Sequence, residues 1–79
     1  MHEEESVAAT AITAYLLAHP HSADTLEGIH RWWIQWPEAP LPVEVTLLAL
    51  ERLEAAGQVE QMNVGGRVIW RARWSVAGE

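Results

Sequence analysis

The sequence predicts a small, mainly helical α+β domain in which three helices precede a two-stranded antiparallel hairpin. Three observations lead to this prediction. Apolar residues recur at helical spacing along three segments of the chain. Proline or glycine stands at the ends of these segments, where helices stop. Two stretches of alternating residues then flank Gly65 and Gly66, which is typical of a hairpin with a two-residue turn.

The first helix is expected over residues 4–18. Acidic side chains in its first turn complement the positive end of the helix dipole. Ile12 and Leu16 then recur on one face, which should turn toward the core. Pro20 ends the helix because the residue before a proline is forced out of helical geometry. Residues 19–23 are therefore expected to form a loop.

The second helix is expected over residues 25–36. Asp24 precedes it and Glu27 follows three residues later, the capping-box spacing in which side chains bond to free backbone amides. A helical wheel divides the segment into a core face with Leu26, Ile29 and Trp33 and an outward part with Glu27, Arg31, Ile34 and Gln35.

The third helix is expected over residues 43–56, after a loop that Pro37, Pro40 and Pro42 make stiff. Gly57 suits the left-handed conformation that often follows the last turn of a helix. The core face of this helix is expected to carry Val43, Thr46, Leu47, Leu50 and Leu53.

The hairpin strands are expected over residues 58–64 and 67–74. A two-residue turn pairs Val64 with Arg67, Met62 with Ile69, and Glu60 with Arg71. The other face of the hairpin has the aromatic bulk of Trp70 and also Val59, so we assign that face to the core.

The composition is that of one small folded domain over residues 1–79, with residues 75–79 as a tail. Hydrophobic residues make up 49% of the chain, which is typical of a globular protein. There is no cysteine, which excludes disulfides and suits a reducing compartment. No apolar run is long enough to span a bilayer, and the N-terminus is acidic, unlike a secretory signal. We therefore expect a cytoplasmic protein without membrane contact.

Residues that could perform catalysis do not occur in the patterns that catalysis requires. His19 and His21 flank Pro20 and His30 lies in the second helix, but no carboxylate or thiol stands beside them at metal-ligand spacing. The chain has no glycine-rich phosphate loop and neither lysine nor cysteine as a nucleophile. A core this small also leaves little room for a ligand pocket. We expect no enzyme activity, cofactor, metal or small-molecule substrate.

The order of the expected elements resembles the winged helix-turn-helix superfamily. The likeness is carried by TLEGIHRWWI in the second helix, LALERLEAAGQVE from the third helix into the hairpin, and RVIWRAR in the last strand. Most characterised members bind DNA, with the third helix in the major groove and the hairpin, called the wing, against the backbone. A substantial minority bind other proteins. The resemblance therefore implies a binding module.

The third helix departs from the chemistry of a DNA-reading helix. Its outward face is expected to carry Glu44, Val45, Leu48, Glu51, Arg52 and Ala55. Glutamates repel phosphate, and aliphatic side chains do not hydrogen-bond to base edges. The formal net charge of -6 also disfavours nucleic acid, since phosphate contacts need a basic surplus. Our first hypothesis is therefore that Glu44, Val45, Leu48, Glu51 and Arg52 contact a partner protein or a second copy. That Val45 and Leu48 are ordinary surface residues remains open.

The expected wing concentrates basic charge on its outward face, at Arg67, Arg71 and Arg73. The alternative hypothesis is a small DNA-binding transcriptional regulator in which these arginines contact phosphate. They could instead grip an acidic protein surface, or simply keep an edge strand from pairing with other sheets. Trp32 and Trp36 lie at the edges of the second helix's apolar face, so at least one should be exposed as an interface anchor.

Overall fold

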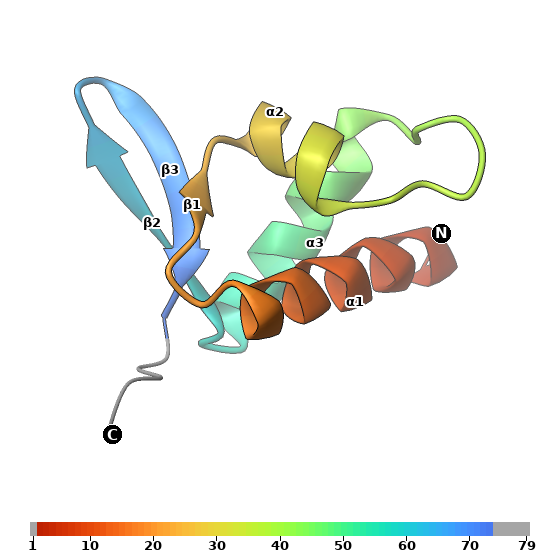
Figure 1. Ribbon diagram of the computed structural model, residues 1–79, viewed down its shortest axis with the longest axis horizontal. Coiled ribbons are helices and arrows are strands. Elements are labelled where there is room, and N and C mark those ends of the chain that lie inside the picture. The colour runs from red at the N-terminus through yellow and green to blue at the C-terminus, as the bar shows by residue number, and fades with distance from the viewer. Residues whose placement is uncertain (1, 74–79) are drawn as a thin grey trace.

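The computed structural model describes residues 2–73 and has an α+β fold, as the sequence predicts. The helices pack together on one side of the molecule, and a small antiparallel sheet with a projecting hairpin lies on the other side (Figure 1). The elements in chain order are α1 (His2–Ala18), β1 (Ala23–Asp24), α2 (Leu26–Gly28), the π-helical turn η1 (Ile29–Trp33), α3 (Val43–Ala55), β2 (Val59–Val64) and β3 (Arg67–Ala72).

The sheet has a third strand, β1, where the sequence predicts the end of a loop and the cap of the second helix. β1 pairs antiparallel with β3, with Ala23 opposite Arg71 and Asp24 opposite Trp70. The strand order is therefore β1-β3-β2, with β3 in the centre. Two residues are too few to show the alternating pattern by which a strand is recognised. The pairing arises only because α1 and α2 bring this segment beside the hairpin.

The second helix begins with a different cap from the one expected. Thr25 is the N-cap, and its hydroxyl accepts a hydrogen bond from the amide of Gly28 at 3.2 Å. Asp24 instead uses a carboxylate oxygen to accept from the amide of Thr25 at 2.7 Å. The capping-box reading of Asp24 and Glu27 is thus wrong by one residue, because Asp24 is held in β1.

The second helix is also shorter than the expected range, residues 25–36. It widens into the π-helical turn η1 and ends at Trp33, and Ile34 has the extended angles φ -107 and ψ 124. Ile34 was expected to point outward but is buried, like Trp33 before it. A wheel drawn at α-helical spacing fails here because a π turn holds more residues than an α turn.

Helix α3 follows Pro42 and covers most of its expected range, residues 43–56. Gly57 after it has φ +79, the left-handed conformation that its position predicts. Val43 and Leu47 are only half-buried, although we expected them in the core. The side chains that α3 does bury are Thr46, Ala49, Leu50 and Leu53.

The hairpin has the register that the Gly65-Gly66 turn predicts, with Met62 opposite Ile69 and Glu60 opposite Arg71. Val59 and Trp70 are buried, so the assignment of their face to the core is confirmed. Val68, nearer the tip on that face, is exposed because the hairpin projects beyond the helices (Figure 1). The end of the expected second strand at Trp74 and the tail over residues 75–79 lie outside the described residues.

A single core joins all the helices to the base of the hairpin. Tyr15 lies against the indole of Trp33, with ring centroids 4.6 Å apart and an interplanar angle of 12°. α1 and α3 pack against each other, and both helices turn small alanines toward the core. The buried apolar residues are Ala8, Ala9, Ile12 and Leu16 of α1, Ile29, Trp33 and Ile34, Ala49, Leu50 and Leu53 of α3, Val59 and Trp70.

Candidate functional site

The outward side of α3 presents a narrow stripe of exposed residues: Glu44, Leu48, Glu51 and Ala55. They recur every three or four positions and so lie along one line of the helix. Leu48 is 51% exposed and is flanked one turn away on either side by a carboxylate. We call these four residues the α3 stripe. Its chemistry is one apolar side chain between two acids.

Two of the residues expected on this surface, Val45 and the exposed Arg52, also contact their own chain. Val45 is half-buried and packs against the core. Arg52 is directed to α1, where its guanidinium donates to the hydroxyl of Ser6 at 3.1 Å and lies 3.8 Å from the carboxylate of Glu5. The basic residue of α3 is therefore paired with α1. Sequence spacing gives no sign of this contact, because its partners lie more than forty residues away in the chain.

The three arginines of the hairpin are exposed, as expected, and lie on one face at alternate positions of β3 and just after it. Arg71 donates from Nε to a carboxylate oxygen of Glu60 at 2.7 Å, across the strand pair. From Arg67 to Arg73 the strand rises by roughly 20 Å. The positive charge is therefore spread along the hairpin, and part of it is offset by Glu60.

The two expected aromatic anchors differ in exposure. Trp32 is 69% exposed, the most exposed aromatic side chain of the described residues. Trp36 is half-buried: its indole N–H donates to the carbonyl of His30 at 3.0 Å, and its ring contacts the imidazole of that residue. Trp32 is thus free to contact a partner, whereas Trp36 is anchored to the second helix.

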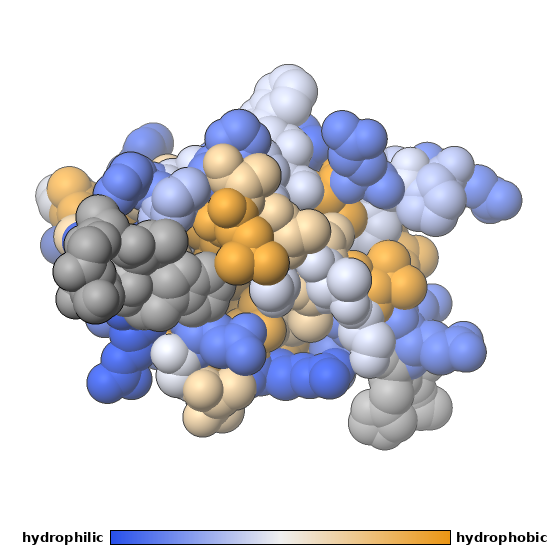
Figure 2. Space-filling view, turned by 60° about the horizontal axis from the view of Figure 1, so that its bottom comes forward, coloured by the Kyte–Doolittle hydropathy of each residue, from blue (hydrophilic) through white to orange (hydrophobic). Residues whose placement is uncertain are grey.

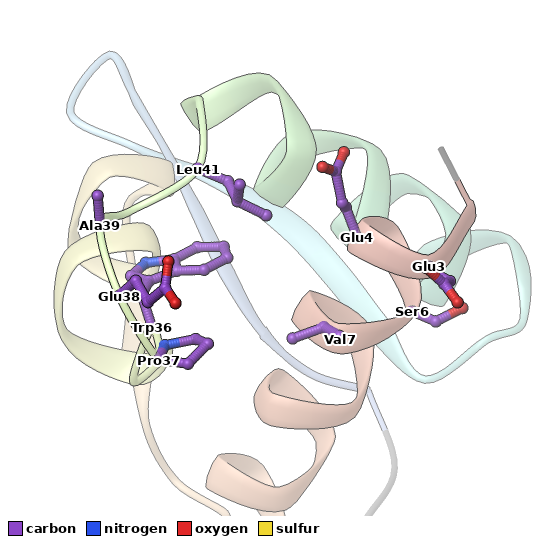
Figure 3. Close-up of a pocket in the computed structure, with 9 residues that line it drawn as sticks. All are labelled: Glu3, Glu4, Ser6, Val7, Trp36, Pro37, Glu38, Ala39 and Leu41. Atoms are coloured by element: carbon purple, nitrogen blue, oxygen red, sulfur yellow. The ribbon is translucent and has the colours of Figure 1, made fainter.

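A surface hollow of about 640 Å³ lies between the first turns of α1 and the loop that follows η1. Val7 lines it from α1, and Trp36, Pro37 and Leu41 line it from the loop (Figure 3). The sequence predicts little room for a ligand pocket within the small core, and this hollow is not part of that core. The hollow lies outside the core, between α1 and the proline-containing loop. The spacing of hydrophobic residues in the sequence does not indicate such a gap between two elements.

The rim of this hollow is acidic. Glu3 and Glu4 come from the first turn of α1, and Glu38 comes from the loop. On the side of the molecule where α1 lies, apolar surface is visible in separate patches between hydrophilic side chains (Figure 2). The hollow therefore combines apolar walls with negative charge.

The histidines whose side chains the structure describes are not assembled into a metal site. His30 is tied to α3 by a hydrogen bond of 2.6 Å between its Nδ1 and the hydroxyl of Thr46. His19 packs against the ring of Tyr15. Within residues 2–73, no three histidine or acidic side chains are placed to hold one metal ion.

None of the helices in the described part of the chain is both long enough and apolar enough to cross a membrane. Comparisons with protein families, with curated proteins and with solved structures gave no match to this chain.

Proposed function

We propose that the chain is a non-enzymatic binding module of the winged-helix type that contacts another protein, or a second copy of itself, through the α3 stripe. Three helices followed by a hairpin support the winged-helix arrangement that the sequence resembles. The cysteine-free composition fits a reducing compartment, and we place the module in the cytoplasm.

The observation that carries this proposal is the exposure of Leu48 between Glu44 and Glu51. An apolar centre with a charged rim is the layout of many protein interfaces. On a helix that reads DNA the same positions would need donors for base edges and phosphates. The α3 stripe offers two carboxylates instead, and Arg52 is engaged with α1.

Leu48→Glu tests the proposal directly. Leu48 is half-exposed and outside the buried core, so the change should leave the fold intact while placing a charge at the centre of the contact. Sedimentation of the wild type and the variant measures self-association. Capture from native lysate at low salt, with and without nuclease, measures a foreign partner. We expect the variant to lose the partner or the dimer, and nuclease to have no effect.

Leu17→Glu is the matched control, because Leu17 is 69% exposed on α1 and lies outside the α3 stripe. It introduces the same charge at another exposed leucine and should change neither measurement. A folded Leu48→Glu protein that keeps its partner and its oligomeric state would remove α3 from the binding surface. Partner loss in both variants would point to a general charge effect.

The second candidate is a DNA-binding regulator that uses the hairpin as a wing. Arg67, Arg71 and Arg73 lie on one exposed face, and this observation favours contact with a phosphate backbone. The acidic α3 stripe and the net charge of -6 oppose it. We therefore rank it second.

A further inference from the structure

The hollow between α1 and the loop has walls that are apolar for a structural reason. The indole N–H of Trp36 donates a hydrogen bond to the carbonyl of His30 and therefore does not need water as a partner. Its ring, Pro37 and Leu41 lie across from Val7, which is 50% exposed (Figure 3). The chain thus keeps several apolar side chains uncovered at one place.

The acidic rim lacks basic partners within the described residues. The ion pairs among the described residues are Arg52 with Glu5 and Arg71 with Glu60, and neither involves a carboxylate of the rim. Glu4 and Glu38 extend from opposite walls of the hollow (Figure 3). Acids in the first turn of a helix stabilise its start, which accounts for Glu4. Glu38 stands in a loop and has no such role, yet it adds charge to the same rim.

We propose that this hollow binds a segment of another protein in which large apolar side chains are flanked by lysine or arginine. A volume of about 640 Å³ lies within the range of specific binding pockets and holds more than one large side chain. Basic flanks complement the rim and select this segment over a neutral or acidic one. The arginine-rich strand β3 of a second copy is a poorer occupant of this hollow, since its Trp70 is buried in its own core and its Arg71 is paired with Glu60.

The probe is a short capped peptide in which leucine and phenylalanine alternate with arginine. One matched peptide has glutamate in place of arginine, and another has serine in place of the apolar residues. Chemical shifts of the amides of Val7 and Leu41 and of the indole N–H of Trp36 report binding. We expect saturable shifts with the first peptide and binding weaker by about tenfold or more with the other two, as charge and apolar contact both contribute.

Paired variants test the rim. Glu4→Gln with Glu38→Gln removes charge from both walls and should weaken the arginine peptide about tenfold and reduce the salt dependence of its binding. Glu44→Gln with Glu51→Gln makes the same charge change on the α3 stripe and should leave peptide binding unchanged. The hollow and the α3 stripe share no residue, so this proposal and the proposed function succeed or fail separately.

Several outcomes would overturn the proposal. Equal binding of the arginine and glutamate peptides would show that the rim does not select charge. Shifts confined to α3 or the hairpin would place the site elsewhere, and no shift at any peptide concentration would mean that the hollow binds no such segment. Concentration-dependent shifts of Val7 and Leu41 in the protein alone, abolished by Arg67→Ala, would identify a second copy as the occupant.

Discussion

The imidazole of His30 and the hydroxyl of Thr46 lie 2.6 Å apart and join the π-helical turn to α3. Thr46 is fully buried, and His30 is half-buried with Trp36 packed on its ring. The pair therefore links the wall of the hollow to the helix that carries the α3 stripe. This contact should contribute to stability, because it supplies the fully buried hydroxyl of Thr46 with a hydrogen-bond partner.

Thr46→Val should lower the free energy of unfolding by about 1–2 kcal/mol, since it keeps the shape of the side chain but leaves a ring nitrogen of His30 unpaired. Urea denaturation followed by tryptophan fluorescence measures the change. Thr10→Val is the control, because Thr10 is exposed on α1 and the same substitution there should have little effect. Equal losses of unfolding free energy in the two variants would show that the hydrogen bond between His30 and Thr46 does not stabilise the fold.

Trp70→Ala should destabilise the fold by roughly 3–5 kcal/mol, a large fraction of the stability of so small a domain. Trp70 is only 4% exposed and packs under the helices at the base of the hairpin. Val68→Ala, two residues away on the same face but exposed, should cost little. Thermal unfolding of both variants measures the contrast. If Val68→Ala proved the more damaging, the core would have to lie nearer the hairpin tip than the burial of Trp70 indicates.

Gly28→Ala should destabilise the protein, although alanine normally stabilises a helix relative to glycine. A Cβ at this position would collide with the carboxylate of Asp24, which accepts the hydrogen bond from Thr25. In an Asp24→Ala background the obstacle is gone, and the same change should then stabilise by up to about 1 kcal/mol. Urea denaturation of the four proteins of this double-mutant cycle measures the effect. If Gly28→Ala changed the free energy of unfolding in the same direction in both backgrounds, the collision with Asp24 would not be its cause.

Duplex DNA should bind weakly at physiological salt, and that binding should depend on the hairpin. Changing Arg67, Arg71 and Arg73 to alanine should abolish it and flatten its salt dependence, because phosphate contacts release counterions. Fluorescence anisotropy at two or more salt concentrations makes the measurement. Arg31→Ala, an exposed arginine outside the hairpin, should have a smaller effect. Tight, sequence-selective binding by the wild type would instead favour the regulator hypothesis.

The features that the sequence predicts well are those fixed by local signals. Gly57 ends α3 and the Gly65-Gly66 turn sets the hairpin register, because each glycine adopts a positive φ at its expected place. β1 and η1 depend on tertiary packing. A two-residue strand has no periodicity of its own, and the π turn that buries Ile34 breaks the spacing on which a helical wheel relies.

The same division holds for the candidate surfaces. The exposure of Glu44, Leu48 and Glu51 follows from helical spacing alone. The contact of Arg52 with α1 does not, since it depends on how two helices distant in the chain pack together. The hollow beside Trp36 was missed for the same reason. Its walls come from separate elements, and only the distance between them creates the space.

The short strand β1 restricts how far the hairpin can move relative to the helices. A hairpin joined to its domain only through the turn after α3 would pivot on Gly57. Here β3 is also bonded to β1, and β1 runs directly into the Thr25 cap of α2. The hairpin is thus connected to the helices in two places, through the turn between α3 and β2 and through the pairing of β3 with β1. Movement of the hairpin would therefore reach the start of α2 through these paired strands, and a change at the Thr25 cap should alter the angle between the hairpin and the helices.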